Sequence, residues 1–151
     1  MTDTIRIVLP WPPAALFPNA RVHHMAAHRA KRPYRAGAKL LAEDALRASG
    51  LAGGEASWPG KDRIPITVTV FPPHNRHDDD NRYAATKTAR DGIADGLGVN
   101  DKRFRCTFQT GDVMKGGAIV VDVPLGSAGG AVERVESVGG CQTAIPDWMR
   151  S

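Results

Sequence analysis

Three aspartates surround one lysine in the segment between residues 77 and 102. Asp78 and Asp80 stand just before an expected helix, Lys87 follows two turns into it, and Asp101 comes directly after it. Carboxylates are the hard oxygen ligands that Mg²⁺ prefers, and a bound divalent cation activates water and neutralises charge on a phosphate. The spacing therefore predicts a metal-dependent nuclease site in which Asp78, Asp80 and Asp101 hold Mg²⁺, or Mn²⁺ in its place.

Helix phasing adds a further acid next to the lysine. At about 100° per residue, Asp80, Lys87 and Asp91 fall within roughly 40° of one another. Asp91 is predicted to hold Lys87 as an i,i+4 pair, so that the ammonium can contact the scissile phosphate or its attacking water. Alone, this pair would also fit an exposed salt bridge, and Asp79 or Asp80 could cap the helix. The opposite face gathers residues expected in the core: Ala85, Ala89, Ile93 and Leu97.

The first third of the chain is strongly basic. The net charge is only +4, but no acidic residue occurs between Thr4 and Ala42. Such a block suits a polyanion such as DNA, although by itself it would also fit a solvated loop. Tyr34 or Trp11 could stack on an unpaired base, with packing inside the protein as the alternative. The residues predicted to contact the DNA backbone are Arg21, Arg29, Lys31, Arg32, Arg35, Arg76, Lys102 and Arg103.

The spacing of the possible ligands disfavours two other kinds of metal site. An EF-hand that began at Asp78 would need a glycine and a glutamate where the chain has Tyr83 and Ala89. His24 and His28 have i,i+4 spacing without the intervening glutamate of a zinc protease, so they are expected to face solvent or phosphate.

Length and composition fit one globular domain. The chain has 151 residues, of which 42% are hydrophobic and 24% charged. Its apolar runs are too short to span a membrane, and its N-terminus lacks the pattern of a secretory signal. We therefore expect a cytoplasmic protein with no membrane partner and no organic cofactor. Cys106 and Cys141 have neither zinc-site spacing nor paired histidines and are interpreted as unrelated reduced thiols.

Hydrophobic periodicity predicts four strands and two helices. In chain order they are a strand at 4–9, a helix at about 34–49, a strand at 64–71, a helix at about 80–97, and strands at 103–112 and 117–123. A short turn at 114–116 joins the last two strands, and Gly98 ends the second helix. Residues 19–32 are expected to form a loop or irregular arm, and residues 126–151 a flexible tail. This β-α-β-α-β-β order predicts a small single α+β domain over residues 1–125, with two helices packed on a mixed four-stranded sheet.

The motifs resemble the RusA family of Holliday junction resolvases, especially its phage-borne members. Four features carry the resemblance, which covers roughly residues 5–123: Asp78-x-Asp80-Asn81, the KxxxDGI pattern from Lys87 through Asp91 to Ile93, Asp101 after LGV, and LPWPP at 9–13 followed by Asn19 and a basic segment ending near Tyr34–Arg35.

The resemblance implies a magnesium-dependent endodeoxyribonuclease that resolves four-way DNA junctions in recombination and repair. Asp78, Asp80 and Asp101 would bind the metal and Lys87 would assist, with Asp91, Asn81 and Asn100 beside them. It also implies a homodimer, in which each subunit cuts one strand symmetrically, of bacterial or phage origin.

Two departures separate the chain from the family pattern. The family usually has two acids where this chain has Asn100 and Asp101, and some members carry the lysine at the position of Ala84. Because Ala84 and Lys87 share a helix face, Lys87 is expected to take the role of that lysine. Asn100 could offer the metal only a neutral oxygen, so the metal affinity is expected to be weaker.

Two other functions are alternatives to the nuclease. The first is a branched-DNA binding protein that has lost efficient cleavage, which the intact set of Asp78, Asp80 and Asp101 disfavours. The second is a DxD phosphatase or sugar transferase. Such an enzyme would need an apolar strand that runs directly into the first aspartate. In this chain the segment PPHNRH separates the strand at 64–71 from Asp78.

Overall fold

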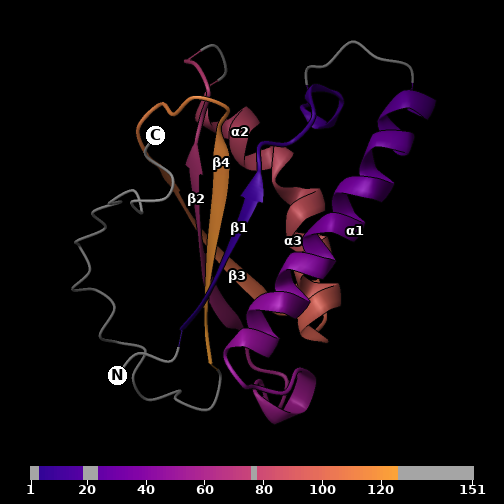
Figure 1. Cartoon of the computed structure of the whole chain (residues 1–151), viewed down its shortest axis with the longest axis vertical. Coiled ribbons are helices and arrows are strands. Elements are labelled where there is room, and N and C mark those ends of the chain that lie inside the picture. Colours follow the sequence, from indigo (N-terminus) through magenta and orange to yellow (C-terminus); the bar gives the residue numbers. More distant parts are fainter. Residues whose placement is uncertain (1–3, 19–23, 76–77, 126–151) are drawn as a thin grey trace.

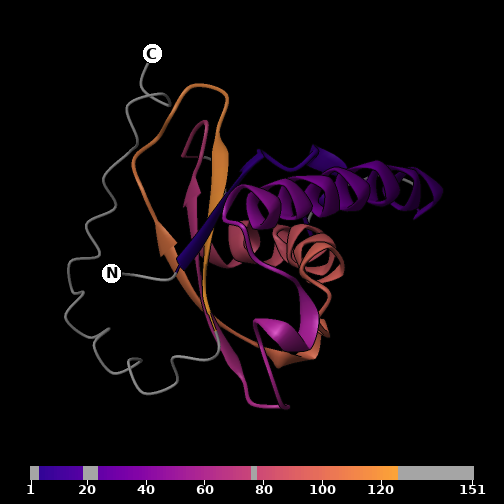
Figure 2. The ribbon, with the colours of Figure 1, turned by 60° about the horizontal axis from the view of Figure 1, so that its bottom comes forward.

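A mixed sheet with helices on one face forms the domain (Figures 1 and 2). The computed structural model describes residues 4–18, 24–75 and 78–125. The main elements in chain order are β1 (Thr4–Pro10), α1 (His24–Ala48), β2 (Ile64–Phe71), α2 (Asp79–Ala85), α3 (Lys87–Leu97), β3 (Phe104–Thr110) and β4 (Ala118–Pro124). This arrangement confirms the α+β fold class. The predicted tail at 126–151, with Cys141, lies outside the described residues.

The sheet has the strand order β1-β4-β2-β3. β4 pairs antiparallel with both β1 and β2, whereas β2 and β3 are parallel. Parallel neighbours need a crossover connection, which α2 and α3 supply. β3 and β4 follow each other in the chain but are not neighbours, so the predicted turn at 114–116 does not close a hairpin. Instead, the chain passes β2 and inserts β4 between β1 and β2.

The alternation of side chains in β2 decides which face the helices cover. Ile64, Ile66, Val68 and Val70 are almost fully buried in the main core, together with alanines and leucines of α1 and α3. Figure 2 shows both helices on that one side of the sheet. Because side chains alternate along a strand, the pattern visible in the sequence fixes the inner face of the sheet.

Helix α1 is longer than the sequence indicated. It starts at His24, so the expected irregular arm is helical from that residue onward. Pro33 lies inside the helix and removes one N–H donor, a cost of about 3 kcal/mol. Alanine, arginine and lysine, which favour helix, occupy most positions from 26 to 32 and offset this cost. The basic side chains of this region are therefore mounted on a regular helix.

The predicted second helix is divided at Thr86. α2 ends at Ala85 and α3 begins at Lys87. The fully buried Thr86 hydroxyl donates to the carbonyl of Tyr83 at 2.6 Å and accepts from Arg90 Nε at 3.1 Å. The predicted core face continues across this break, because Ala85 of α2 and Ala89, Ile93 and Leu97 of α3 are all almost fully buried. The common face expected for Asp80 and Lys87 stays a prediction. Gly98 ends α3 in the left-handed conformation.

Glycines let α3 lie directly against the backbone of α1. A methyl group on Gly92 would lie 2.4 Å from the carbonyl oxygen of Arg35 and 2.7 Å from Ala38 Cβ. At Gly96 the corresponding distances are 2.5 Å to the carbonyl oxygen of Lys39 and 2.7 Å to Ala42 Cβ. Gly96 follows Gly92 by four residues, and its contacts in α1 also lie four residues later in the chain. Helices α1 and α3 therefore run in the same direction. Within the described residues, no helix is long and apolar enough to cross a membrane.

Replacement of Gly92 by alanine tests this close contact. The added methyl group would overlap backbone atoms that cannot rotate away, so Gly92→Ala should lower the free energy of unfolding by about 2 kcal/mol or more. Gly37→Ala is the control, because Gly37 lies in α1 with nothing within 4 Å of its added methyl group. That change should raise the free energy of unfolding by up to about 1 kcal/mol through helix propensity. Urea denaturation measures both, and equal effects would contradict the packing described.

Candidate active site

Lys87 lies between two carboxylates. Its Nζ donates to Asp91 Oδ1 at 2.6 Å and to Asp101 Oδ2 at 2.9 Å. The predicted i,i+4 pair is therefore confirmed, and a second acid from beyond the helix joins it. The lysine side chain is 56% exposed, whereas that of Asp91 is 20% exposed, so the ammonium sits at the protein surface above a partly buried carboxylate.

A turn after α3 brings Asp101 back to the lysine. Gly98 reverses the chain, and the short 3-10 helix η3 (Asp101–Arg103) packs against α3. Asn100 caps η3, since its side-chain Oδ1 accepts from the backbone N–H of Lys102 at 2.8 Å. The Asn100 amide thus has a structural role at the start of η3, directly before Asp101.

The three charges stabilise one another. The hydrogen bond from Lys87 lowers the pKa of Asp101, and the hydrogen bonds to Asp101 and Asp91 raise the pKa of Lys87. Opposite charges in contact favour the ionised form of each group. These contacts therefore favour the charged forms of Lys87 and Asp101.

Asp78 and Asp80 lie at the start of α2. Asp78 is the N-cap, and its Oδ1 accepts from the backbone N–H of Asn81 at 3.0 Å. The expectation that Asp79 or Asp80 would cap this helix is therefore wrong. Asp80 is exposed in the first turn. Both candidate ligands thus project from the first residues of one short helix.

A hydrogen-bonded network that the sequence did not indicate fixes this helix to β3. Asp79 Oδ1 accepts from Arg82 at 3.0 Å and from the hydroxyl of Thr110 at 2.9 Å. Because Thr110 gives its hydrogen to the carboxylate, Tyr83 is the donor in its 2.8 Å contact with Thr110. Arg82 is 7% exposed and also donates to the carbonyl of His74. Only the i,i+3 spacing of Asp79 and Arg82 is a local signal, since Thr110 is distant in sequence.

The donor chemistry suits Mg²⁺, but the predicted ligands are not gathered around one point. Among residues 4–18, 24–75 and 78–125, no group of three or more His, Cys, Asp or Glu side chains is arranged to hold a metal ion. The Asp78 carboxylate caps a helix and the Asp101 carboxylate contacts Lys87. Binding of a metal by Asp78, Asp80 and Asp101 would require these contacts to rearrange.

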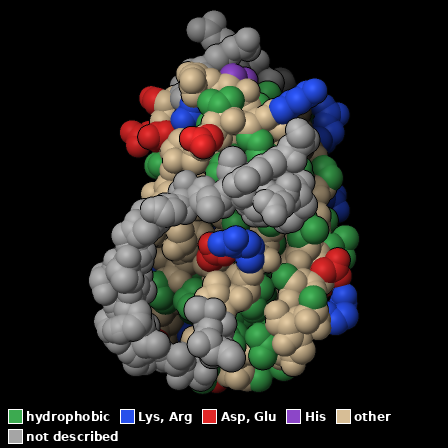
Figure 3. Space-filling view, turned by 60° about the vertical axis from the view of Figure 1, so that its left-hand side comes forward, with side chains coloured by type: hydrophobic (Ala, Val, Ile, Leu, Met, Phe, Trp, Pro, Cys, Tyr) green, Lys and Arg blue, Asp and Glu red, His purple; other side chains and the backbone are tan. Residues whose placement is uncertain are grey.

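The basic residues predicted to contact DNA fall into two groups. Arg29, Lys31, Arg32 and Lys102 are exposed, the first three on the N-terminal half of α1. Figure 3 shows basic side chains gathered along one upper edge of the face it presents, apart from an acidic group at the other edge. Arg21 and Arg76 lie outside the described residues.

Arg35 and Arg103 are engaged in contacts within the protein. Arg35 forms a two-point ion pair with Asp95, at 2.7 and 3.1 Å. Arg103 donates to three backbone carbonyls, those of Trp58, Pro59 and Asp62. Its guanidinium therefore holds a loop in place, and the expected DNA contact of Arg103 stays a prediction. Its position after Asp101 gave no local sign of it.

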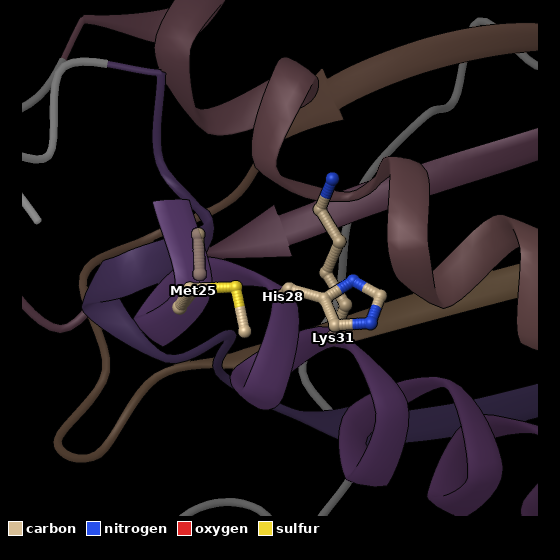
Figure 4. Close-up of a pocket in the computed structure, with 4 residues that line it drawn as sticks. Met25, His28 and Lys31 are labelled. Atoms are coloured by element: carbon tan, nitrogen blue, oxygen red, sulfur yellow. The ribbon is translucent and has the colours of Figure 1, made fainter. Parts of the chain in front are cut away.

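An open pocket of about 520 Å³ lies along the N-terminal half of α1 (Figure 4). Met25, Ala27, His28 and Lys31 line it.

The two aromatic residues expected to stack on a base or to pack inside the protein do the latter. The hydroxyl of Tyr34 donates to the carbonyl of Pro10 at 2.6 Å, and burial raises the pKa of this hydroxyl. Trp11 packs beside Phe17.

Comparison with known proteins identifies one relative without an assigned activity. No family model matches the chain. The chain is similar to an uncharacterized protein of Xylella fastidiosa (strain Temecula1), with 40% identity over 99 residues, which are 65% of this chain and 61% of that protein. The chain thus spans less than two thirds of the length of this relative, and the inference of function rests on the site.

Removal of the Lys87 ammonium tests the electrostatics of the site. In Lys87→Met, the pKa of Asp101 should rise toward the ordinary aspartate value, because its main stabilising hydrogen bond is lost. Carboxyl-detected NMR titration measures this pKa. Since a lowered pKa contributes stability that disappears as pH falls through it, the native protein should lose more stability on acidification than the variant. Lys102→Met, which removes a neighbouring positive charge, should leave the Asp101 pKa nearly unchanged.

Proposed function

We propose that the chain is a magnesium-dependent, structure-selective endodeoxyribonuclease that resolves four-way DNA junctions by paired symmetric nicks. It would act as a homodimer, because two strands of one junction must be cut. The observation that carries the proposal is the contact of the Lys87 ammonium with both Asp91 and Asp101 on an exposed surface. The resemblance of the motifs around Asp78 and Lys87 to RusA-type resolvases supports the same reaction.

The residues divide into ligands and charge carriers. Asp78, Asp80 and Asp101 would hold Mg²⁺, which, when bound, activates a water and neutralises charge on the phosphate. Lys87 is 56% exposed, so its ammonium can reach a phosphate that approaches from solvent. Asp91 keeps the ammonium close to Asp101.

The basic part of α1 lies near this acidic cluster. The guanidinium of Arg35 has a raised pKa, first because of its hydrogen bond to Asp95 and also because of the charges of Asp91 and Asp101. α1 therefore passes beside the site, and Arg29, Lys31 and Arg32 extend from it one to two turns earlier. A DNA backbone held by these exposed cations would lie next to Lys87.

A second function, junction binding with weak or lost cleavage, has its own support. Asn100 uses its side-chain oxygen to cap η3, and no three ligands are gathered for metal in the described residues. Weak metal affinity would leave the basic surface able to bind branched DNA without cutting it efficiently.

A nicking assay separates these two functions. The purified chain is incubated with a mobile four-way junction and with linear duplex, each with Mg²⁺, with Mn²⁺ and with chelator. Paired nicks in the junction alone, only when metal is present, are expected. Junction binding without nicks under any metal would instead support the binding protein.

Asp80→Asn tests the role of one carboxylate. Asp80 is exposed at the start of α2, so the change should not disturb folding. The variant should lose cleavage by a factor of about 100 or more, because a ligand charge is removed. Its junction affinity, measured by gel shift, should stay equal or rise, since a negative charge facing DNA is lost. Asp44→Asn on the far part of α1 is the control and should cut normally, whereas loss of binding in Asp80→Asn would show that Asp80 is structural.

A further inference from the structure

We propose that Arg103 is a positioning residue for the candidate site. Its guanidinium ties η3 to the loop of residues 49–63, called here the α1–β2 loop. This tie sets where the Asp101 carboxylate meets the Lys87 ammonium. The role rests on the proposed function, because it concerns how the same site is held in place for a phosphate that approaches it.

The α1–β2 loop offers three carbonyl groups to one guanidinium. Arg103 Nη1 donates to the carbonyl of Trp58 at 2.9 Å, and Nε donates to that of Asp62 at 3.0 Å. Nη2 donates to the carbonyl of Pro59 at 3.3 Å. Every nitrogen of the guanidinium is thus engaged, and because the group is planar and rigid, the three bonds together fix the loop and η3 relative to each other.

The α1–β2 loop is itself anchored to the sheet and to α3. Trp58 is fully buried, and its indole N–H donates to the carbonyl of Pro124, at the end of β4, at 2.7 Å. The same loop lies against the C-terminal end of α3, since a methyl group on Gly53 would lie 2.7 Å from the carbonyl oxygen of Leu97 (Figure 2). The carbonyl groups that Arg103 contacts therefore belong to a fixed support.

η3 connects this support to Asp101 because it is a single turn. Asp101 and Arg103 are its first and last residues. The backbone N–H of Arg103 donates to the carbonyl of Asn100 at 2.9 Å, which closes the turn around Asp101. In so short a hydrogen-bonded turn, a displacement of Arg103 displaces Asp101 as well.

The contact between Lys87 and Asp101 is too exposed to hold this turn by itself. The two side chains are 56% and 38% exposed. Ion pairs of such exposure contribute little, because the cost of ordering two solvated side chains offsets their attraction. Arg103 is half-buried and makes three hydrogen bonds that its charge strengthens. The contacts of Arg103 therefore decide the place of Asp101, and Lys87 meets the carboxylate there.

NMR of the Lys87 side chain tests this role. Its ammonium resonance is recorded in a nitrogen-edited spectrum of the full chain for the native protein, Arg103→Met, Arg103→Lys and Arg105→Met. Asp101→Ala supplies the reference resonance of an ammonium that is held by Asp91 alone. Both Arg103 variants should shift the resonance toward this reference, because neither side chain can span three carbonyls. Arg105→Met is the matched control, since Arg105 is exposed two residues further along, and its resonance should be native.

The NMR outcomes decide between anchoring and charge. An unchanged Lys87 resonance in both Arg103 variants would overturn the positioning role. A native resonance in Arg103→Lys with a shifted one in Arg103→Met would also overturn it, because positive charge alone would then suffice. A general loss of stability leaves the resonance of the folded molecules in place, so it does not imitate the expected shift. If Arg103→Met fails to fold, Arg103→Lys decides the question.

Nicking kinetics separate positioning from a direct DNA contact. In a native chain that nicks four-way junctions, Arg103→Met should lower kcat about tenfold or more and leave KM nearly unchanged, because the site moves while the DNA contacts remain. A raised KM with a native kcat, together with a weaker salt dependence of junction binding, would show that Arg103 holds a phosphate instead and would overturn the positioning role.

Failure of the proposed function has a different signature. A native chain that nicks no junction, in which the Arg103 variants still shift the Lys87 resonance, would overturn the nuclease and leave the placement of Asp101 by Arg103 supported.

Discussion

The close contact between α1 and α3 is the constraint on which the rest of the structure depends. Gly92 and Gly96 leave no room for a side chain, so α3 lies against the backbone carbonyls of Arg35 and Lys39 and the methyl groups of Ala38 and Ala42. This contact lets both helices cover one face of a narrow sheet. It also brings Arg35 of α1 to Asp95 of α3. The basic helix and the acidic site are therefore neighbours because two glycines have no side chains.

The candidate residues come from three places in the chain, and the structure joins two of them, α3 and the turn that follows it. α3 supplies Lys87 and Asp91, and the reversal at Gly98 returns Asp101 to the same surface. α2 supplies Asp78 and Asp80, and its start is tied to the end of β3 through Asp79 and Thr110. The parallel pairing of β2 and β3 makes this possible, since it carries the crossover formed by α2 and α3 over the core face.

Charge in the site is balanced by the protein's own side chains. The acids that would bind a metal are already occupied, Asp101 by an ammonium and Asp78 by a backbone N–H. Such an arrangement keeps exposed carboxylates from repelling one another at little cost, because surface ion pairs are weak and exchange readily.

The sequence by itself determined much of the local structure. Alternation in β2 identified the buried face, Gly98 marked the end of α3, and the spacing of Lys87 and Asp91 predicted their ion pair. These features depend on residues a few positions apart, where the geometry of the helix or strand alone determines which side chains contact each other. Sequence did not reveal the early start of α1 at His24, because Pro33 interrupts a segment that otherwise favours helix. Nor did it reveal the break at Thr86, where a buried hydroxyl bonds to Tyr83 and Arg90. Nor did it show strand order, the Thr110 contact or the role of Arg103, which join segments more than thirty residues apart. Only the tertiary structure could decide these, since distant partners leave no periodic trace in the chain.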